Sequence, residues 1–88
     1  MSIIYMDNNA TTAVAPEVFE AMRPYLTELY GNPSSMYRFG GVVGRALKTA
    51  REQVAGLIGA QPDEIVFTSC GTEADSTAIR SALRVKPA

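Results

Sequence analysis

The run from Ile65 to Asp75 constrains the fold of this chain most, because it has the pattern of a strand, a turn and a helix in succession. Ile65–Thr68 is a short apolar run with β-branched and aromatic side chains, typical of a strand covered on both faces. Small residues follow at Ser69–Gly71, and Thr72 with Asp75 three positions later is a variant of the capping box that begins helices. A helix N-terminus leaves backbone N–H groups unpaired and carries a positive partial charge, so the turn predicts a cup for a phosphorylated ligand. On these residues alone, a strand–turn–helix unit that binds nothing is an equal alternative.

The spacing of apolar residues predicts three helices. The first covers about residues 16–29, and Pro24 inside it is expected to kink the helix or split it in two. The second covers about residues 42–58 and is followed by Gly59, where a left-handed C-terminal residue is favoured. The third covers about residues 73–83.

A strand at Ile65–Thr68 needs neighbouring strands, because its backbone groups must find hydrogen-bond partners. The only other candidate is a weak one at Ile3–Met6. The simplest interpretation is that the chain is the front part of a larger α/β protein. The opposing interpretation is a complete small helical domain, in which residues 65–68 form a short edge piece.

Composition excludes several classes of function. The 88 residues carry a net charge of -1 without a basic cluster, which argues against binding to nucleic acid or to an anionic membrane. No apolar run approaches the roughly 20 residues that span a bilayer. A single cysteine and no histidine exclude an internal disulfide and a zinc-type ligand cluster, so we expect no metal and a reducing, cytoplasmic location.

Three motifs, in order along the whole chain, carry a resemblance to a known family. Met6–Thr12 has the sequence Met-Asp-Asn-Asn-Ala-Thr-Thr, and Tyr30–Ser35 has Tyr-Gly-Asn-Pro-Ser-Ser, followed by Phe39-Gly40. Thr68–Glu73 has Thr-Ser-Cys-Gly-Thr-Glu. The chain resembles the N-terminal segment of the cysteine desulfurases. It is most similar to their nitrogen-fixation branch, NifS, because the housekeeping branch generally has Gly in place of Cys70 and Asn in place of Ser76.

The resemblance implies a pyridoxal 5'-phosphate (PLP) enzyme of the class V aminotransferase type, with the α/β architecture of fold type I. This segment of it would be mostly helical with one or two strands. Residues 1–15 would be an N-terminal extended segment, and residues 16–88 the incomplete start of the large PLP-binding domain. Such enzymes work as homodimers and convert L-cysteine to L-alanine. They carry the sulfur as a persulfide to a scaffold protein for iron–sulfur cluster assembly.

The resemblance assigns Gly71 and Thr72 to the cofactor phosphate and assigns no catalytic residue to this chain. Neither Lys48 nor Lys86 lies in a motif that carries the family's aldimine lysine, which is farther downstream in relatives. The persulfide cysteine is also downstream, so Cys70 is expected to have a packing role. By this interpretation the 88-residue chain alone is inactive.

Other functions stay open at this stage. A selenocysteine lyase or another class V aminotransferase shares the same cofactor cup. A truncated, non-catalytic module for dimerisation or binding belongs to a different class. A nucleotide-phosphate binder is disfavoured, because the turn lacks both the lysine of a Walker loop and the spaced glycines of a dinucleotide site.

Overall fold

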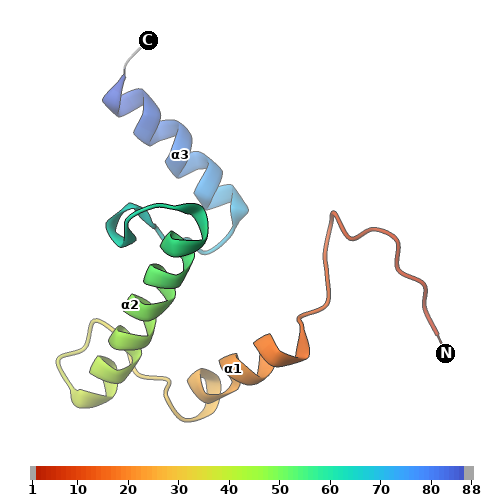
Figure 1. The fold of residues 1–88 in the computed structure, drawn as a ribbon, viewed down its shortest axis with the longest axis horizontal. Coiled ribbons are helices and arrows are strands. Elements are labelled where there is room, and N and C mark those ends of the chain that lie inside the picture. The colour runs from red at the N-terminus through yellow and green to blue at the C-terminus, as the bar shows by residue number, and fades with distance from the viewer. Residues whose placement is uncertain (1, 87–88) are drawn as a thin grey trace. The chain divides into compact units, whose positions relative to one another are not determined.

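The computed structural model describes residues 2–86 (Figure 1). Its elements are α1 (Pro16–Thr27), α2 (Arg38–Ile58), the short 3-10 helix η1 (Pro62–Glu64) and α3 (Gly71–Val85). The chain divides into two compact units, Met1–Leu47 and Lys48–Ala88. No helix within the described residues has the length and apolar character needed to cross a membrane.

The mostly helical prediction is confirmed, but the predicted strands are wrong. Within residues 2–86 no β-ladder forms, either at Ile65–Thr68 or at Ile3–Met6. The backbone of Ile65 is nevertheless extended, with φ −94° and ψ 127°. A strand is defined by hydrogen bonds to a neighbour, and the described chain supplies no second extended segment beside this one. At Ile65 the local conformation therefore follows the prediction, whereas the pairing does not.

Pro24 does not split the first helix. Helix α1 begins at Pro16, as predicted, and continues through Pro24 to Thr27. The N–H of Glu28 donates to the carbonyl of Pro24 over 2.9 Å, which closes the last turn. A proline removes only one intrahelical donor, so a helix that ends one turn later retains most of its hydrogen bonds. Leu29, expected to belong to the apolar stripe, lies beyond the end of the helix.

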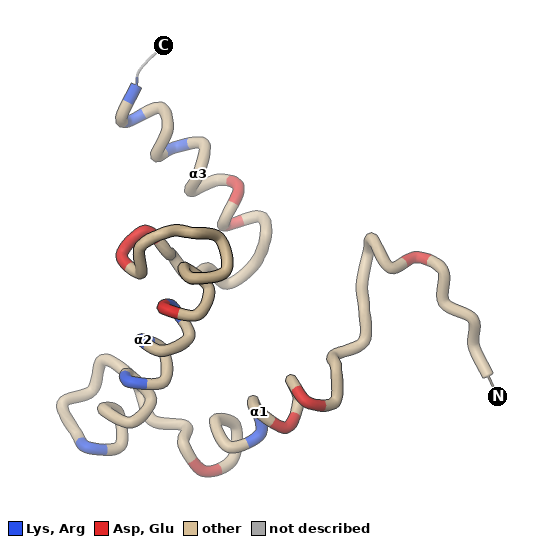
Figure 2. Tube along the Cα trace, in the orientation of Figure 1, with Lys and Arg blue, Asp and Glu red and all other residues tan. Residues whose placement is uncertain are grey.

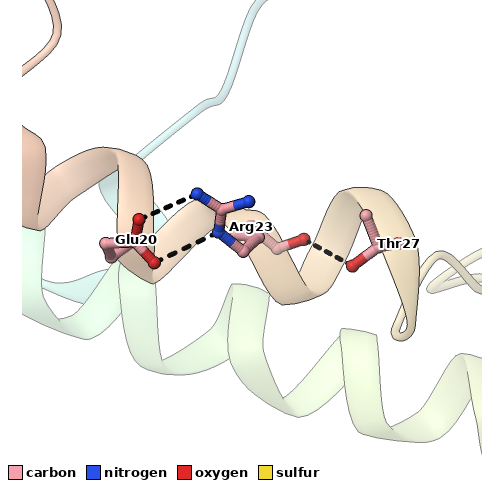
Figure 3. Close-up of polar contacts among 3 residues, drawn as sticks. All are labelled: Glu20, Arg23 and Thr27. Carbon is pink, nitrogen blue, oxygen red and sulfur yellow. Dashed lines mark hydrogen bonds and ion pairs between the residues drawn. The ribbon is translucent and has the colours of Figure 1, made fainter.

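Side chains on α1 reinforce the turns around Pro24 (Figure 3). The guanidinium of Arg23 forms an ion pair with Glu20 at 2.9 Å, and the Thr27 hydroxyl donates to the Arg23 carbonyl over 3.0 Å. Arg23 also lies over the ring of Phe19, 4.8 Å from its centroid. The hydrogen bond with Glu20 raises the pKa of Arg23. Since the two charged side chains are 54% and 63% exposed, the pair adds little stability.

The loop between α1 and α2 is fixed by its own hydrogen bonds. The Asn32 side-chain oxygen accepts from the N–H of Ser34 at 2.9 Å, and the Asn32 carbonyl accepts from the N–H of Ser35 at 3.0 Å. The rings of Tyr30 and Phe39 meet edge to face with centroids 5.1 Å apart. Helix α2 begins at Arg38 rather than near residue 42. The predicted start was late because apolar spacing does not mark the glycine-rich first turn.

The second unit has very little core. The most buried apolar residues are Ala55 and Ile65, which are 1% and 9% exposed. Among the apolar residues of α2, Leu57 is 86% exposed and Val54 is 40% exposed. Gly59 has φ +70°, which confirms its predicted place after the helix. The turn that follows is closed by the N–H of Gln61, which donates to the Glu64 carboxylate at 2.7 Å, giving η1 where a plain loop was expected.

Substitution of Gly40 by alanine should destabilise the protein. A Cβ there would lie 2.3 Å from the Asn32 carbonyl oxygen and 2.8 Å from the Ser35 Cβ, so the loop would have to move. We expect Gly40→Ala to cost about 1–3 kcal/mol, as overpacking does, despite the better helix propensity of alanine. Urea unfolding of the protein measures the change.

The matched control is Gly56→Ala in the same helix, where a Cβ would meet no heavy atom within 4 Å. It should be neutral or stabilising by up to about 1 kcal/mol, because only helix propensity changes. Equal effects of the two substitutions would contradict the close approach of the loop to Gly40.

Candidate functional site

The N-terminus of α3 forms where the extended segment ends. Cys70 is the N-cap residue, with an extended backbone at φ −166° and ψ 171°. The first backbone hydrogen bond of the helix runs from the N–H of Ala74 to the Cys70 carbonyl over 3.1 Å. The N–H groups of residues 71–73 therefore precede the helical ladder and point out of its end. Gly71 and Thr72, predicted as cofactor-binding residues, are the first two residues of this 15-residue helix.

Glu73 occupies part of the predicted cup. Its carboxylate accepts from the N–H of Ser69 at 3.1 Å and from the Ser69 hydroxyl. The predicted capping box of Thr72 and Asp75 is therefore wrong, because the helix begins two residues earlier and Glu73 reaches back instead. The Ser69 contacts lower the pKa of the Glu73 carboxyl. The donors of Ser69 are thus already satisfied by an internal anion.

Gly71 and the Thr72 side chain remain open, whereas the Thr72 N–H lies toward the Cys70 thiol and helps to lower the pKa of that thiol. A Cβ built at Gly71 would meet no heavy atom within 4 Å, and its backbone does not have positive φ. The glycine is therefore not needed for an unusual backbone conformation. The Thr72 hydroxyl makes no hydrogen bond with the residues that the structure describes, and its side chain is exposed. The end of α3 offers backbone donors, a hydroxyl and free space for an anion.

Charges along α3 follow the helix dipole (Figure 2). Acidic Glu73 lies in the first turn and basic Arg84 in the last, so each partial charge of the helix meets a side chain of opposite sign. Glu73 offsets part of the positive potential at the N-terminus.

Cys70 is exposed and is the N-cap residue of α3. The N–H of Glu73, followed by the Ser69 hydroxyl, holds the pKa of the Cys70 thiol below its ordinary value, against a smaller opposing effect of desolvation. Helix N-termini favour thiolates for the same reason that they favour phosphates. The packing role expected for Cys70 does not fit an exposed side chain.

The two lysines lie apart from this turn in the chain. Lys48 is exposed on α2, and Lys86 follows the last residue of α3. Within residues 2–86 no group of three or more His, Cys, Asp or Glu side chains could hold a metal ion.

Sequence reasoning missed two contacts near the turn. The Glu73–Ser69 bridge could have been predicted from the sequence, because the side chain of an acidic residue at the third helical position commonly bonds back to the start of the helix. The second contact joins Arg51 of α2 to the extended segment at Ile65 and Phe67. No sequence pattern predicts this contact, because Arg51 and Ile65 lie 14 positions apart.

Comparison of the sequence with known proteins identifies the family of this chain. The family model described as aminotransferase class-V matches residues 4–88. The chain belongs to the class V aminotransferase family. The predicted resemblance is therefore confirmed at this level, and it covers nearly the whole chain.

The class V aminotransferases most similar to this chain include several named cysteine desulfurases. One from Trichormus azollae is 68% identical over 87 residues, which cover 99% of this chain and 22% of the relative. The protein named cysteine desulfurase NifS from Azotobacter vinelandii is 59% identical over 88 residues, again 99% of this chain and 22% of the relative. The chain thus spans about a fifth of the length of these relatives.

The lowered pKa of Cys70 predicts early alkylation. Because a lower pKa gives thiolate at lower pH, the iodoacetamide reaction should reach its half-maximal rate at a lower pH than that of free glutathione. Cys70 is the only thiol of the 88-residue chain, so the measurement has a single source. Ser69→Ala should move the profile back toward higher pH. A profile that coincides with glutathione would contradict thiolate stabilisation at this helix end.

Proposed function

We propose that this chain is the N-terminal segment of a cysteine desulfurase, which removes sulfur from L-cysteine to give L-alanine and an enzyme persulfide. Two facts support this proposal. The relatives at 68% and 59% identity carry that name, and the matched region includes all three motifs quoted above. The similarity to NifS favours the nitrogen-fixation branch.

The proposal extends to the rest of the predicted protein. Residues 1–15 are a leading extended segment, and residues 16–88 begin the large cofactor-binding domain of fold type I. The complete enzyme is a cytoplasmic homodimer that passes its sulfur to a scaffold protein for iron–sulfur cluster assembly.

One structural observation supports a role in holding PLP: the open N-terminus of α3 at Gly71 and Thr72. Phosphate needs several donors and a space without side chains. This turn offers backbone N–H groups outside the helical ladder, a hydroxyl without a partner among the described residues, and empty space at Gly71. The residues present therefore fit the phosphate of PLP. When bound, PLP supplies the electron sink for chemistry at the amino-acid substrate.

Each residue of the turn has a separate task in this proposal. The N–H groups of Gly71 and Thr72 and the Thr72 hydroxyl donate to phosphate oxygens. Gly71 leaves room for the phosphate to approach the backbone. Glu73 binds Ser69 and so holds the turn that leads into the helix. The chain anchors and orients the phosphate end, and the groups that react with substrate come from elsewhere in the enzyme.

Removal of the Thr72 donors should weaken PLP binding in the full-length protein. Thr72→Ala removes the hydroxyl and should cost about 1–2 kcal/mol, typical of a hydrogen bond to a charged acceptor. Thr72→Pro should cost more, because it also removes the backbone donor. Proline is tolerated in the first turn of a helix, so this change leaves α3 able to form.

Titration of the apoprotein with PLP, followed by absorbance, measures the affinity. Thr77→Ala, also on exposed α3 but beyond its first turn, is the matched control and should not change it. Unchanged PLP affinity in both Thr72 variants would place the phosphate elsewhere.

The 88-residue chain alone should not form alanine from L-cysteine faster than PLP does in solution. Neither Lys48 nor Lys86 adjoins the turn in sequence, and the lysine that bonds the cofactor in relatives is expected downstream. The test incubates the chain with PLP, reduces with borohydride, and measures labelled lysine and alanine. Specific labelling of either lysine, together with alanine above the PLP-only rate, would contradict this prediction.

A further inference from the structure

Arg51 makes the one long-range polar contact of the described chain. Its Nη1 donates to the carbonyl of Ile65, 14 positions away, and its guanidinium lies 4.9 Å from the centre of the Phe67 ring. Every other hydrogen bond among residues 2–86 joins partners no more than six positions apart. Arg51 is half-buried, unlike the exposed Lys48 one turn before it.

The contact lies on the most buried part of the second unit. Arg51 and Ala55 are four residues apart and so share one face of α2. Ala55 is 1% exposed and the side chain of Ile65 is 9% exposed. In Figure 1 the chain turns back after α2, through η1, before it enters α3. Arg51 therefore holds the returning segment at its backbone and at an aromatic ring.

A short series of contacts leads from Arg51 to the start of α3. Phe67, under the guanidinium, is followed by Thr68, whose hydroxyl donates to the Cys70 carbonyl at 3.1 Å. That carbonyl accepts the first hydrogen bond of α3. Gly71 comes four residues after Phe67, so the direction in which the helix end points depends on where residues 65–67 are held.

We propose that Arg51 is a positioning residue for the phosphate site at Gly71 and Thr72. It touches neither the cofactor nor the reacting atoms, and it acts by fixing the segment that delivers the N-terminus of α3. This inference rests on the proposed function, because it takes PLP phosphate as the ligand of that helix end.

Arginine suits this position for a physical reason. Its planar guanidinium donates in its plane and stacks through its face, so one group can bind the Ile65 carbonyl and cover Phe67 together. A lysine keeps the charge and the aliphatic stem, but its ammonium cannot do both in a fixed geometry. Methionine keeps the stem alone.

The test compares PLP with pyridoxal, which lacks the phosphate, in titrations of the full-length apoprotein. Arg51→Met should weaken PLP binding roughly tenfold, about the loss of one hydrogen bond to a charged acceptor, and leave pyridoxal binding within about twofold. Arg51→Lys should retain only part of the wild-type PLP affinity. Lys48→Met, one turn away on the same helix and exposed, is the matched control and should change neither affinity.

The phosphate-selective loss separates positioning from general destabilisation, which would weaken both ligands alike. Titrations are made well below the melting temperature on variants whose circular dichroism matches the wild type. If Arg51→Met does not fold, Arg51→Lys is tested in its place. Equal loss of both ligands, or no loss of PLP affinity in the folded variant, overturns the inference. If Arg51→Met has no effect while Thr72→Ala weakens PLP binding, the inference fails and the proposed site stands. If Thr72→Ala and Thr72→Pro also leave PLP binding unchanged, the proposed site itself fails.

Discussion

An extended backbone segment must find acceptors and donors for its polar groups, and in this chain the segment at Ile65–Thr68 has no β-strand beside it within the described residues. One side chain, Arg51, satisfies the Ile65 carbonyl from the neighbouring helix. The hydrogen bond is charge-assisted and lies in a partly buried place, so it is stronger than one between neutral groups. The approach to α3, and therefore the direction of its open end, depends on this contact.

The remaining hydrogen bonds of the described chain are local. This explains why the helices form although many of their apolar side chains stay exposed. Helices form from bonds between residues four apart and need no distant partner. Burial of their apolar faces does need one, yet Ile79 of α3 stays 63% exposed and Leu26 of α1 stays 68% exposed. The apolar faces of these helices are therefore left largely uncovered within the described residues.

The features that could be predicted from sequence are those with local causes. Pro16 marks the start of α1, and Gly59 follows α2 with the expected left-handed backbone. The end of α3 was placed within two residues, at Val85 rather than residue 83. Local chemistry fixes each of these positions through a ring, an absent side chain or the helical period.

The failures have causes that lie outside a local window. A strand depends on a neighbour that can be far away in sequence, so the apolar run at residues 65–68 predicted the extended backbone of Ile65 correctly and the pairing wrongly. The start of α3 was misplaced because Thr72 is a better capping residue than Cys70 by propensity. Glu73 reverses that preference by binding Ser69. Three motifs in order identified the family, although no local rule could find Arg51.

The bridge between Glu73 and Ser69 has a consequence for how a ligand would be received. Both partners lie within five consecutive residues, so the shape of the turn is established as the helix forms, without help from a ligand. If a phosphate binds at Gly71 and Thr72 as proposed, it would meet donors already in place and would not have to order the backbone. Such preorganisation spares the entropy that binding to a mobile loop would lose.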